Sequence, residues 1–244
     1  MLSLLGLMVG GIGARALAAQ GGPPLETDDP GTPGAGRLEL NVSAEAHWEG
    51  SRTLYDAPRL DANLGVGRHL QLKLEVPWRV ATAPASPASS GMGNVTLGVK
   101  WRFAEFGPVA VSTYPQVTLS GSERSQSKGL ADSGTTLFMP VEIAWVAGPV
   151  ALNAEAGYQA GPGAAELVYG LALAHQASPS VELLGECHGG GEADLSHQGV
   201  LCGAGFRWEP LRALCLLLAF TTAVAGSADD RADHRLYSGV QLRW

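Results

Sequence analysis

Residues 37–48 read Arg-Leu-Glu-Leu-Asn-Val-Ser-Ala-Glu-Ala-His-Trp, and polar and apolar side chains alternate through the whole stretch. A period of two places the apolar side chains on one face of a β-strand and the polar ones on the other. A half-buried strand of a soluble sheet also alternates, so this stretch alone does not decide the class. The pattern recurs about a dozen times, at lengths close to the ~9–11 residues of a membrane-crossing strand, and this repetition predicts a transmembrane β-barrel.

The composition narrows the class further. The chain has 244 residues, a formal net charge of −7 and 16% charged residues, and its length suits one large all-β unit. The acidic balance argues against nucleic acid as a partner, because nucleic-acid binding calls for a basic surface. After the N-terminal segment the longest apolar run is Ala213–Phe220. That run is far below the ~18 residues of a membrane-spanning helix, so a helical membrane protein is excluded.

Three segments follow one another along the chain. Residues 1–19 read as a signal peptide, because an apolar core precedes the small-residue cleavage site Ala16-Leu17-Ala18. No basic residue precedes that core, which makes the signal atypical. Residues 20–36 are rich in Pro and Gly and predict a periplasmic leader outside the first strand, although the sequence does not decide whether they enter the barrel. Residues 37–244 form the predicted outer-membrane β-barrel.

The spacing of the alternating stretches predicts the topology. The expected strands are 37–48, 58–66, 69–79, 93–103, 109–120, 134–146, 150–159, 166–175, 180–188, 199–208, 212–222 and 235–244. Connections from even to odd strands are short, whereas most of the others are longer and more polar. We therefore predict an all-β, antiparallel transmembrane barrel of about 12 strands, with short periplasmic turns and longer extracellular loops, in a bacterial outer membrane.

Tryptophan placement supports the same fold. All six tryptophans fall on the apolar faces, at the ends of expected strands, and predict two aromatic girdles at the membrane boundaries. They are Trp48, Trp78, Trp101, Trp145, Trp208 and Trp244. The last strand ends in Trp244 with apolar residues at alternate positions before it. This ending resembles the signal by which outer-membrane barrels are handed to the barrel assembly machinery, and we expect that partner together with outer-membrane lipids.

Several short stretches carry a family resemblance. The leader (residues 23–34), Leu-Lys-Leu-Glu-Val-Pro-Trp (72–78), Leu-Gly-Val-Lys-Trp-Arg-Phe (97–103) and Ser-Thr-Tyr-Pro-Gln (112–116) are similar to outer-membrane transporter barrels grouped with the meta-pathway of phenol degradation. The likeness covers nearly the whole mature chain. It implies a barrel that passes small solutes, aromatic or hydrophobic ones among them, and it implies no catalytic residues.

The inward faces of the expected strands carry charges of both signs. The candidate pore-lining residues are Glu39, Glu45, Arg59, Asp61, Lys73, Glu75, Lys100, Arg102, Glu142, Glu155, Glu182 and Glu186. In a water-filled lumen such charges tune selectivity, whereas in a packed interior they neutralise one another. Twelve strands lie between the ~8 that pack solid and the ~16 that leave a wide channel. A narrow pore and a plugged lumen therefore both remain open.

No motif for catalysis, cofactor binding or metal binding is present, so we expect a protein that is not an enzyme and has no cofactor. The three cysteines favour buried free thiols, although Cys187 and Cys202 could face each other across one hairpin. The leading function is a channel or transporter for small solutes through a narrow charged lumen. The alternatives are a non-conducting structural or adhesive barrel, a barrel-embedded lipid hydrolase and a soluble secreted β-sandwich.

Overall fold

The structure, a computed structural model, describes residues 22–226 and 234–244. The expected signal peptide, residues 1–19, lies outside the described residues. Within these two ranges no helix is long and apolar enough to cross a membrane.

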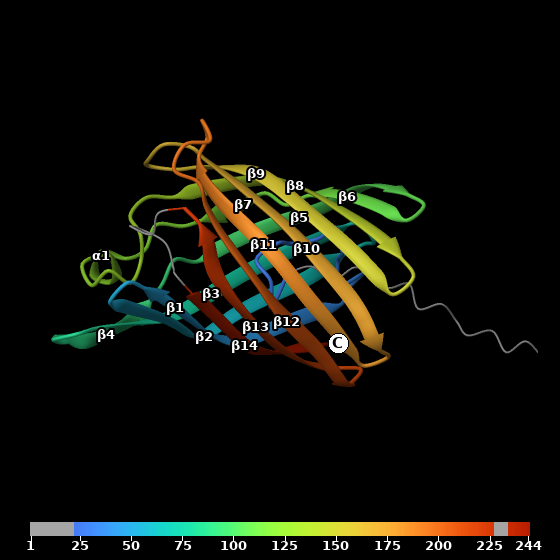
Figure 1. Cartoon of the computed structure of the whole chain (residues 1–244), viewed down its shortest axis with the longest axis horizontal. Helices are drawn as coiled ribbons and strands as arrows, with labels where there is room; N and C mark the ends of the chain where they lie inside the picture. Colours follow the sequence, from blue (N-terminus) through green and yellow to red (C-terminus); the bar gives the residue numbers. More distant parts are fainter. Residues whose placement is uncertain (1–21, 227–233) are drawn as a thin grey trace, which may run out of the picture.

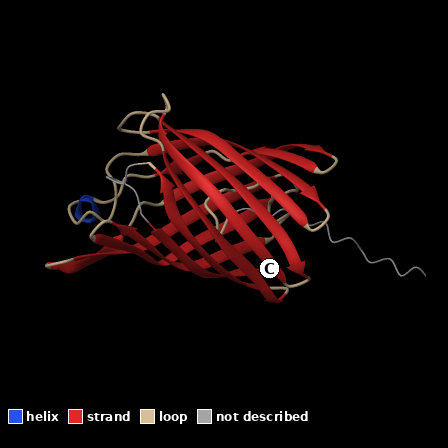
Figure 2. Cartoon of the chain, viewed as in Figure 1, coloured by secondary structure: helices blue, strands red, loops and turns tan. Residues whose placement is uncertain are grey.

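Nearly all of the described chain is one antiparallel sheet, drawn with its strands labelled in Figure 1 and coloured red in Figure 2. Its elements are β1 (Leu38–Glu49), β2 (Arg52–Val66), β3 (Leu70–Ala83), β4 (Ser86–Met92), β5 (Thr96–Phe106), β6 (Val109–Thr113), β7 (Gln116–Thr118), α1 (Glu123–Gln126), β8 (Thr136–Ala147), β9 (Val150–Ala160), β10 (Glu166–Ser178), β11 (Val181–Glu192), β12 (Gly199–Leu211), β13 (Leu214–Ala225) and β14 (His234–Arg243). Because β14 pairs with β1 and β5 pairs with β3, the sheet closes into a ring.

The fourteen strands make twelve passes of the barrel wall. β4 and β5 both pair with β3 and form one pass, which is interrupted where the Gly93 N–H donates to the Pro77 carbonyl, 2.9 Å away. β6 and β7 both pair with β5 and β8 and form another pass, interrupted at Tyr114 and Pro115. Proline has no N–H to donate to a ladder, so strand assignment breaks there. The predicted twelve-stranded antiparallel barrel is confirmed.

Most large apolar side chains of the strands face outward, and most of their charged side chains face inward. Val99 and Val141 expose 46% and 49% of their surface, whereas their chain neighbours Lys100 and Glu142 expose 2% and 0%. A soluble protein buries its apolar residues and exposes its charges, so this arrangement is inverted. It is the arrangement of a barrel whose outer surface contacts lipid.

Two expected loops are strands in the structure. β2 begins at Arg52 rather than at residue 58, because Thr53 and its neighbours pair with both β1 and β3. The register of the β2–β3 ladder shifts between Asp56 and Arg59, at Pro58. Because of this shift, the first half of β2 does not continue the alternation of its second half. Residues 81–92, expected to be irregular, form the β3–β4 hairpin, which projects beyond the other strands in Figure 1.

Short turns lie mostly at one end of the barrel, and the long loops lie at the other. One end carries the turns 67–69, 107–108, 148–149, 179–180 and 212–213, and the other carries the loops 119–135, 161–165 and 193–198. The tight turns 50–51 and 84–85 also lie at the second end. We call these the short-turn end and the long-loop end, which in outer-membrane barrels are periplasmic and extracellular respectively.

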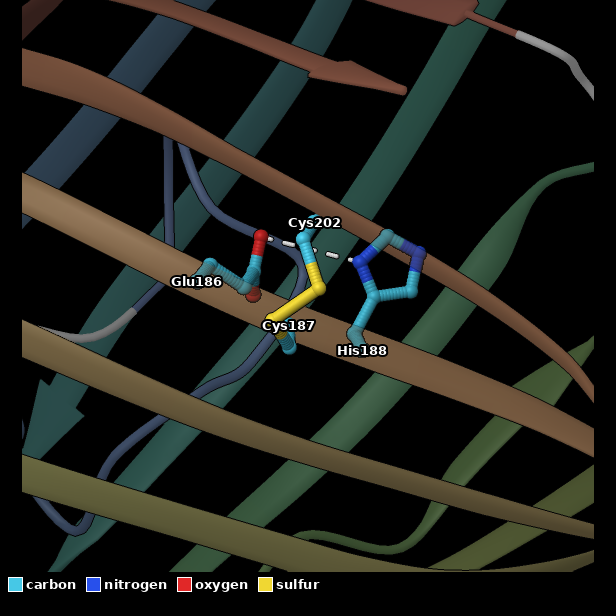
Figure 3. The surroundings of a disulfide bond; sticks show 4 residues. All are labelled: Glu186, Cys187, His188 and Cys202. Carbon is cyan, nitrogen blue, oxygen red and sulfur yellow. Dashed lines mark ion pairs between the residues drawn. A yellow bond between two sulfur atoms is a disulfide. The ribbon is translucent and has the colours of Figure 1, made fainter. Parts of the chain in front are cut away.

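A disulfide joins two neighbouring strands of the wall. Cys187 of β11 and Cys202 of β12 are directly opposite in the ladder, with Cα atoms 4.1 Å apart, and their sulfurs are bonded. The sequence favoured free thiols at these positions and left a bridge across the hairpin as the alternative. The favoured interpretation was wrong, because the register of the β11–β12 ladder places the two cysteines directly opposite each other. Figure 3 shows the bridge beside Glu186 and His188, which flank Cys187 along β11 and, by alternation, face the lumen. Cys215 is a buried free thiol.

Candidate functional site in the barrel lumen

The described part of the N-terminal leader lies inside the barrel. We call residues 22–33 the N-terminal plug; they appear in blue within the ring of strands in Figure 1. Leu25 and Thr27 are buried, and the plug makes hydrogen bonds and ion pairs with β5, β11, β12 and β14. The described leader residues therefore do not lie in the periplasm outside the first strand, as the sequence predicted. The question that the sequence left open is answered by contacts that only the closed barrel provides.

A glycine-rich turn directs the chain from the plug into β1. Gly34 and Gly36 have φ angles of 92° and 69°, a left-handed conformation that glycine adopts readily. The Arg37 N–H donates to the Gly34 carbonyl at 3.1 Å. This turn passes so close to β2 that a Cβ on Gly65 would lie 1.9 Å from the Gly34 oxygen. The crossing therefore requires glycine at position 65.

Lys100 of β5 is the first anchor of the plug. Its Nζ donates to the Asp28 carboxylate at 2.7 Å and to the Asp29 carbonyl, and it lies 4.6 Å from the centre of the Tyr114 ring. Behind it, the Glu142 carboxylate is 3.7 Å away. A buried ammonium is costly unless it is paired, so Asp28 supplies charge compensation that the wall alone provides only in part.

Carboxylates and cations of β11, β12 and β14 form the second anchor. The Glu186 carboxylate accepts hydrogen bonds from the Glu26 and Thr27 backbone N–H groups, at 3.2 and 2.5 Å. The Arg207 guanidinium donates to the Pro23 and Gly22 carbonyls at 3.1 and 3.0 Å. Arg235 pairs with the Glu26 carboxylate at 3.0 Å. The plug is thus held by both its side chains and its backbone.

Ion pairs run across the lumen face of β1, β2 and β3, which we call the charged wall. Arg59 lies between Glu45 and Glu75, 2.7 Å from each carboxylate. Lys73 continues the row, 2.9 Å from Glu75 and 3.9 Å from Asp61. The sequence indicated lateral pairing between these strands, and the structure joins the charges into one continuous chain.

A row of neutral polar groups extends the charged wall toward β6. The Asn41 and Asn63 amides donate to Asp61, the Gln71 amide donates to the Asn63 oxygen at 2.8 Å, and Gln71 also donates to the Tyr114 hydroxyl at 3.1 Å. Buried polar groups are normally satisfied in this way. The Tyr114 ring therefore has a fixed position between the row and the Lys100 ammonium.

The opposite side of the lumen is lined by small apolar side chains, which we call the apolar wall. It consists of Ala144, Ala151, Ala172, Ala174, Leu184 and Ala219, from β8–β11 and β13. Leu25 of the plug packs into this wall. Alanine side chains leave room over the sheet, and the leucine side chain fills that room. The Gly170 backbone allows the same close approach, since a Cβ there would lie 2.1 Å from the Thr27 hydroxyl.

The plug does not fill the lumen. A cavity of about 1860 Å³ remains between the plug and the walls. Its lining includes Glu166 and Glu192 at the long-loop end and Arg212 and Trp244 at the short-turn end. The cavity therefore extends along the barrel from one mouth toward the other.

Most of the predicted pore-lining residues face this cavity. Nine of the twelve line it: Glu39, Glu45, Arg59, Asp61, Lys73, Glu75, Lys100, Glu155 and Glu182. Glu186 contacts the plug, Glu142 is fully buried beside the Ser112 hydroxyl, and Arg102 pairs with Glu105 near the short-turn end. Their role in conduction stays a prediction.

The tryptophans face outward, but not all of them end a strand. Trp145, Trp208 and Trp244 lie near the short-turn end, and Trp78 and Trp101 lie inside longer strands, because β3 and β5 continue beyond them. Five of the six expose more than two fifths of their surface, and Trp48 is half-buried. Their action as membrane girdles stays a prediction.

Tyr114 is a lumen residue outside the predicted set of charged pore-lining residues. Alternation along the expected strand 109–120 places Ser112, Tyr114 and Gln116 on one face; in the structure Ser112 donates to Glu142, and Tyr114 and Gln116 line the cavity. The signal was therefore the alternation itself, carried by residues without charge. The plug residues Glu26 and Asp28 were missed for a different reason, since the leader has no periodicity that could assign its side of the barrel.

The exposed loop 193–198 brings a serine, a histidine and carboxylates together. The His197 Nδ1 is 3.2 Å from the Ser196 hydroxyl and 3.3 Å from the Glu192 carboxylate. A catalytic triad uses both ring nitrogens, one for the nucleophile and one for the carboxylate, so this group is not one. The Ser196 side chain and N–H lower the pKa of Asp194 by hydrogen-bonding its carboxylate. Among the described residues no group of His, Cys, Asp and Glu could hold a metal ion.

No family model and no curated protein matches this sequence. Among solved structures, the COG4313 outer membrane channel from Pseudomonas putida F1 is similar, with a TM-score of 0.71 and 12% identity, over 92% of this chain and 100% of that one. The NanC porin has a TM-score of 0.60 and 9% identity, over 83% of this chain and 98% of its own. The KdgM porin has a TM-score of 0.57 and 8% identity, over 84% and 98%. At these identities the likeness shows the fold, which is that of bacterial outer-membrane barrels.

Proposed function

We propose that this chain, folded as a bacterial outer-membrane barrel, is a channel that passes small solutes through its narrow, charged lumen. The observation that carries the proposal is the cavity of about 1860 Å³ whose lining reaches both ends of the barrel. A barrel that served only as a scaffold has no need of such a passage. Solved channels and porins share the fold, which supports the proposal without naming a solute.

The lining gives the passage a mixed character. Charged side chains of both signs line it and can select ions and polar solutes by field strength. Apolar side chains, among them Leu25, Val168 and Leu201, also line it and offer contact to apolar groups. This combination suits small solutes with an apolar part. It agrees with the aromatic or hydrophobic cargo that the resemblance to the phenol meta-pathway barrels implies.

The surroundings of the barrel are part of the proposal. The outward-facing apolar residues would contact outer-membrane lipids, and β14 together with Trp244, which follows it, would present the recognition signal to the barrel assembly machinery. Both partners follow from the outward face of the barrel rather than from its lumen.

A second candidate is a non-conducting structural barrel. The observation that favours it is the plug, which crosses the lumen and is held by Lys100, Glu186, Arg207 and Arg235. In that case the remaining cavity would be a water-filled space without a through path.

Single-channel recording of the refolded mature chain in planar bilayers separates the two candidates. We expect a small, stable conductance, and we expect Lys73→Glu to shift the reversal potential in a salt gradient toward cation selectivity, because Lys73 lines the cavity.

Lys128→Glu is the matched control, because Lys128 lies on the exposed loop that follows α1. Its reversal potential should equal that of the unchanged chain. Correctly folded barrels that pass no current would contradict the channel and favour the structural barrel.

A further inference from the structure

The plug presents two chemically different groups to two different parts of the lumen. Leu25 inserts its apolar side chain among the alanines of the apolar wall. Asp28 places its carboxylate 2.7 Å from the Lys100 ammonium. Because Asp28 lies three positions after Leu25, their Cα atoms are at most about 11 Å apart. The plug therefore occupies the lumen as a compact unit with one apolar end and one anionic end.

We infer that the lumen contains a binding site for small organic carboxylates with an apolar body, and that Leu25 and Asp28 occupy this site in the structure. The inference deepens the proposed channel function and rests on it, since a solute must reach the lumen. The solute carboxylate takes the place of Asp28 on Lys100, and its apolar body takes the place of Leu25 on the apolar wall.

Charge balance selects the anionic solute. Lys100 exposes only 2% of its surface, so removing Asp28 without replacement leaves a buried ammonium with less compensation, which is strongly unfavourable. A neutral solute of the same shape causes this loss, whereas a carboxylate does not. Glu142 and Glu155 on the wall side keep their positions in both cases, so exchanging one carboxylate for another adds no new repulsion.

Tyr114 and the cavity complete the site. The Tyr114 ring lies 4.6 Å from the Lys100 nitrogen and is fixed by its hydrogen bond from Gln71. This contact orients the ammonium toward the plug. Asp28, Lys100, Tyr114 and Leu25 all border the open cavity, so an incoming solute can meet the site without opening the barrel wall.

The tether between plug and barrel sets the expected affinity. A group on a short linker competes at an effective concentration on the order of millimolar. Free solute must exceed this concentration to replace the plug, so the unchanged chain should bind only weakly. Weak binding suits a channel, which must also release its solute.

Equilibrium dialysis of the refolded chain against radiolabelled hexanoate, hexan-1-ol and acetate tests the site, with protein-free micelles as the blank. Hexanoate has both groups, hexan-1-ol lacks the charge and acetate lacks the apolar body. We expect hexanoate to bind most tightly. Asp28→Asn removes the competing charge and should strengthen hexanoate binding about tenfold or more, the value of one charged hydrogen bond.

Further variants separate the two ends of the site. Leu25→Ala should strengthen hexanoate binding about tenfold but leave acetate binding unchanged, because only the apolar competitor is lost. Lys100→Gln should abolish the preference of hexanoate over hexan-1-ol. Lys128→Gln, on the exposed loop, is the control and should bind like the unchanged chain.

Three results would overturn the inference: equal binding of hexan-1-ol and hexanoate, equal binding of acetate and hexanoate, or unchanged hexanoate binding in Asp28→Asn. Bilayer currents recorded from the same preparations distinguish this failure from failure of the channel. Current without selective hexanoate binding would contradict only the proposed carboxylate site. Selective hexanoate binding without current would contradict only the proposed channel.

Discussion

The charged wall and the apolar wall belong to strands of similar length, and large apolar side chains cover the outer faces of both. Their inner faces differ in chemistry. On β1–β3 the charges compensate one another through Arg59, Lys73 and their carboxylate partners. On β8–β11 and β13 small apolar side chains leave a recess that Leu25 of the plug fills. One wall is complete in itself, and the other is completed by a segment from elsewhere in the chain.

This difference between the two walls indicates which part of the lumen is suited to binding a solute. A wall whose charges are mutually neutralised can act on a passing ion through its field, but it offers little free energy for holding a solute, because a bound solute must break existing pairs. A recess occupied by a tethered side chain can accept a solute by simple exchange. The plug and the wall residues it covers, rather than the densest cluster of charges, are therefore the part of the lumen suited to recognition.

The largest expected change in stability tests whether the charges of the charged wall compensate one another. Arg59→Met removes the cation that Glu45 and Glu75 share and should lower the free energy of unfolding by about 3–5 kcal/mol, because it leaves the buried Glu45 carboxylate without its arginine partner and leaves Glu75 with Lys73 alone. Guanidinium unfolding in lipid vesicles, followed by tryptophan fluorescence, measures the loss. Arg68→Met, in the exposed turn 67–69, is the control and should change the value by less than about 0.5 kcal/mol. A loss below ~1 kcal/mol from Arg59→Met would show that water in the lumen compensates the carboxylate charges.

A smaller effect tests whether the walls differ only on the inside. Leu74 of β3 and Val141 of β8 face outward, and each lies four residues from a tryptophan of its own strand. Leu74→Arg and Val141→Arg should each lower the free energy of unfolding by about 2–4 kcal/mol, because each brings a charge into the lipid. The two losses should agree, since lipid meets both walls alike.

Leu74→Met, which keeps an apolar side chain, is the control for this pair and should cost less than ~1.5 kcal/mol. A cost near zero for either arginine would contradict the outward assignment of that wall. Unequal costs would mean that the two outer faces differ as well.

The smallest effect concerns the disulfide on the outer face of β11 and β12. Replacing both Cys187 and Cys202 by Ser should lower the free energy of unfolding by about 2 kcal/mol, because the bridge closes a 15-residue separation in the unfolded chain. Reducing agent should lower the stability of the unchanged chain to the same value and leave the double variant unaffected. Equal stabilities with and without the bridge would show that the ladder alone holds these strands.

Much of the fold was predictable because its signal is local. Alternation from Leu38 onward decides which side chains share a face, and every face assignment depends only on neighbours in the chain. Loop lengths then separate the two ends, and closure follows from the demand that a spanning sheet in lipid leave no unpaired edge. Where prolines interrupt the ladder, at Pro58 and Pro115, the local signal fails and the strand limits were misplaced.

The sequence by itself thus determined the barrel, its outward apolar surface and the inward position of its charges. Only the tertiary structure decided that residues 22–33 lie in the lumen, that Lys100 meets Asp28 and that Cys187 faces Cys202. The reason is that the leader has no periodicity to orient it. Its place depends on whether volume and charge match between residues that closure of the ring brings together from strands far apart in the chain.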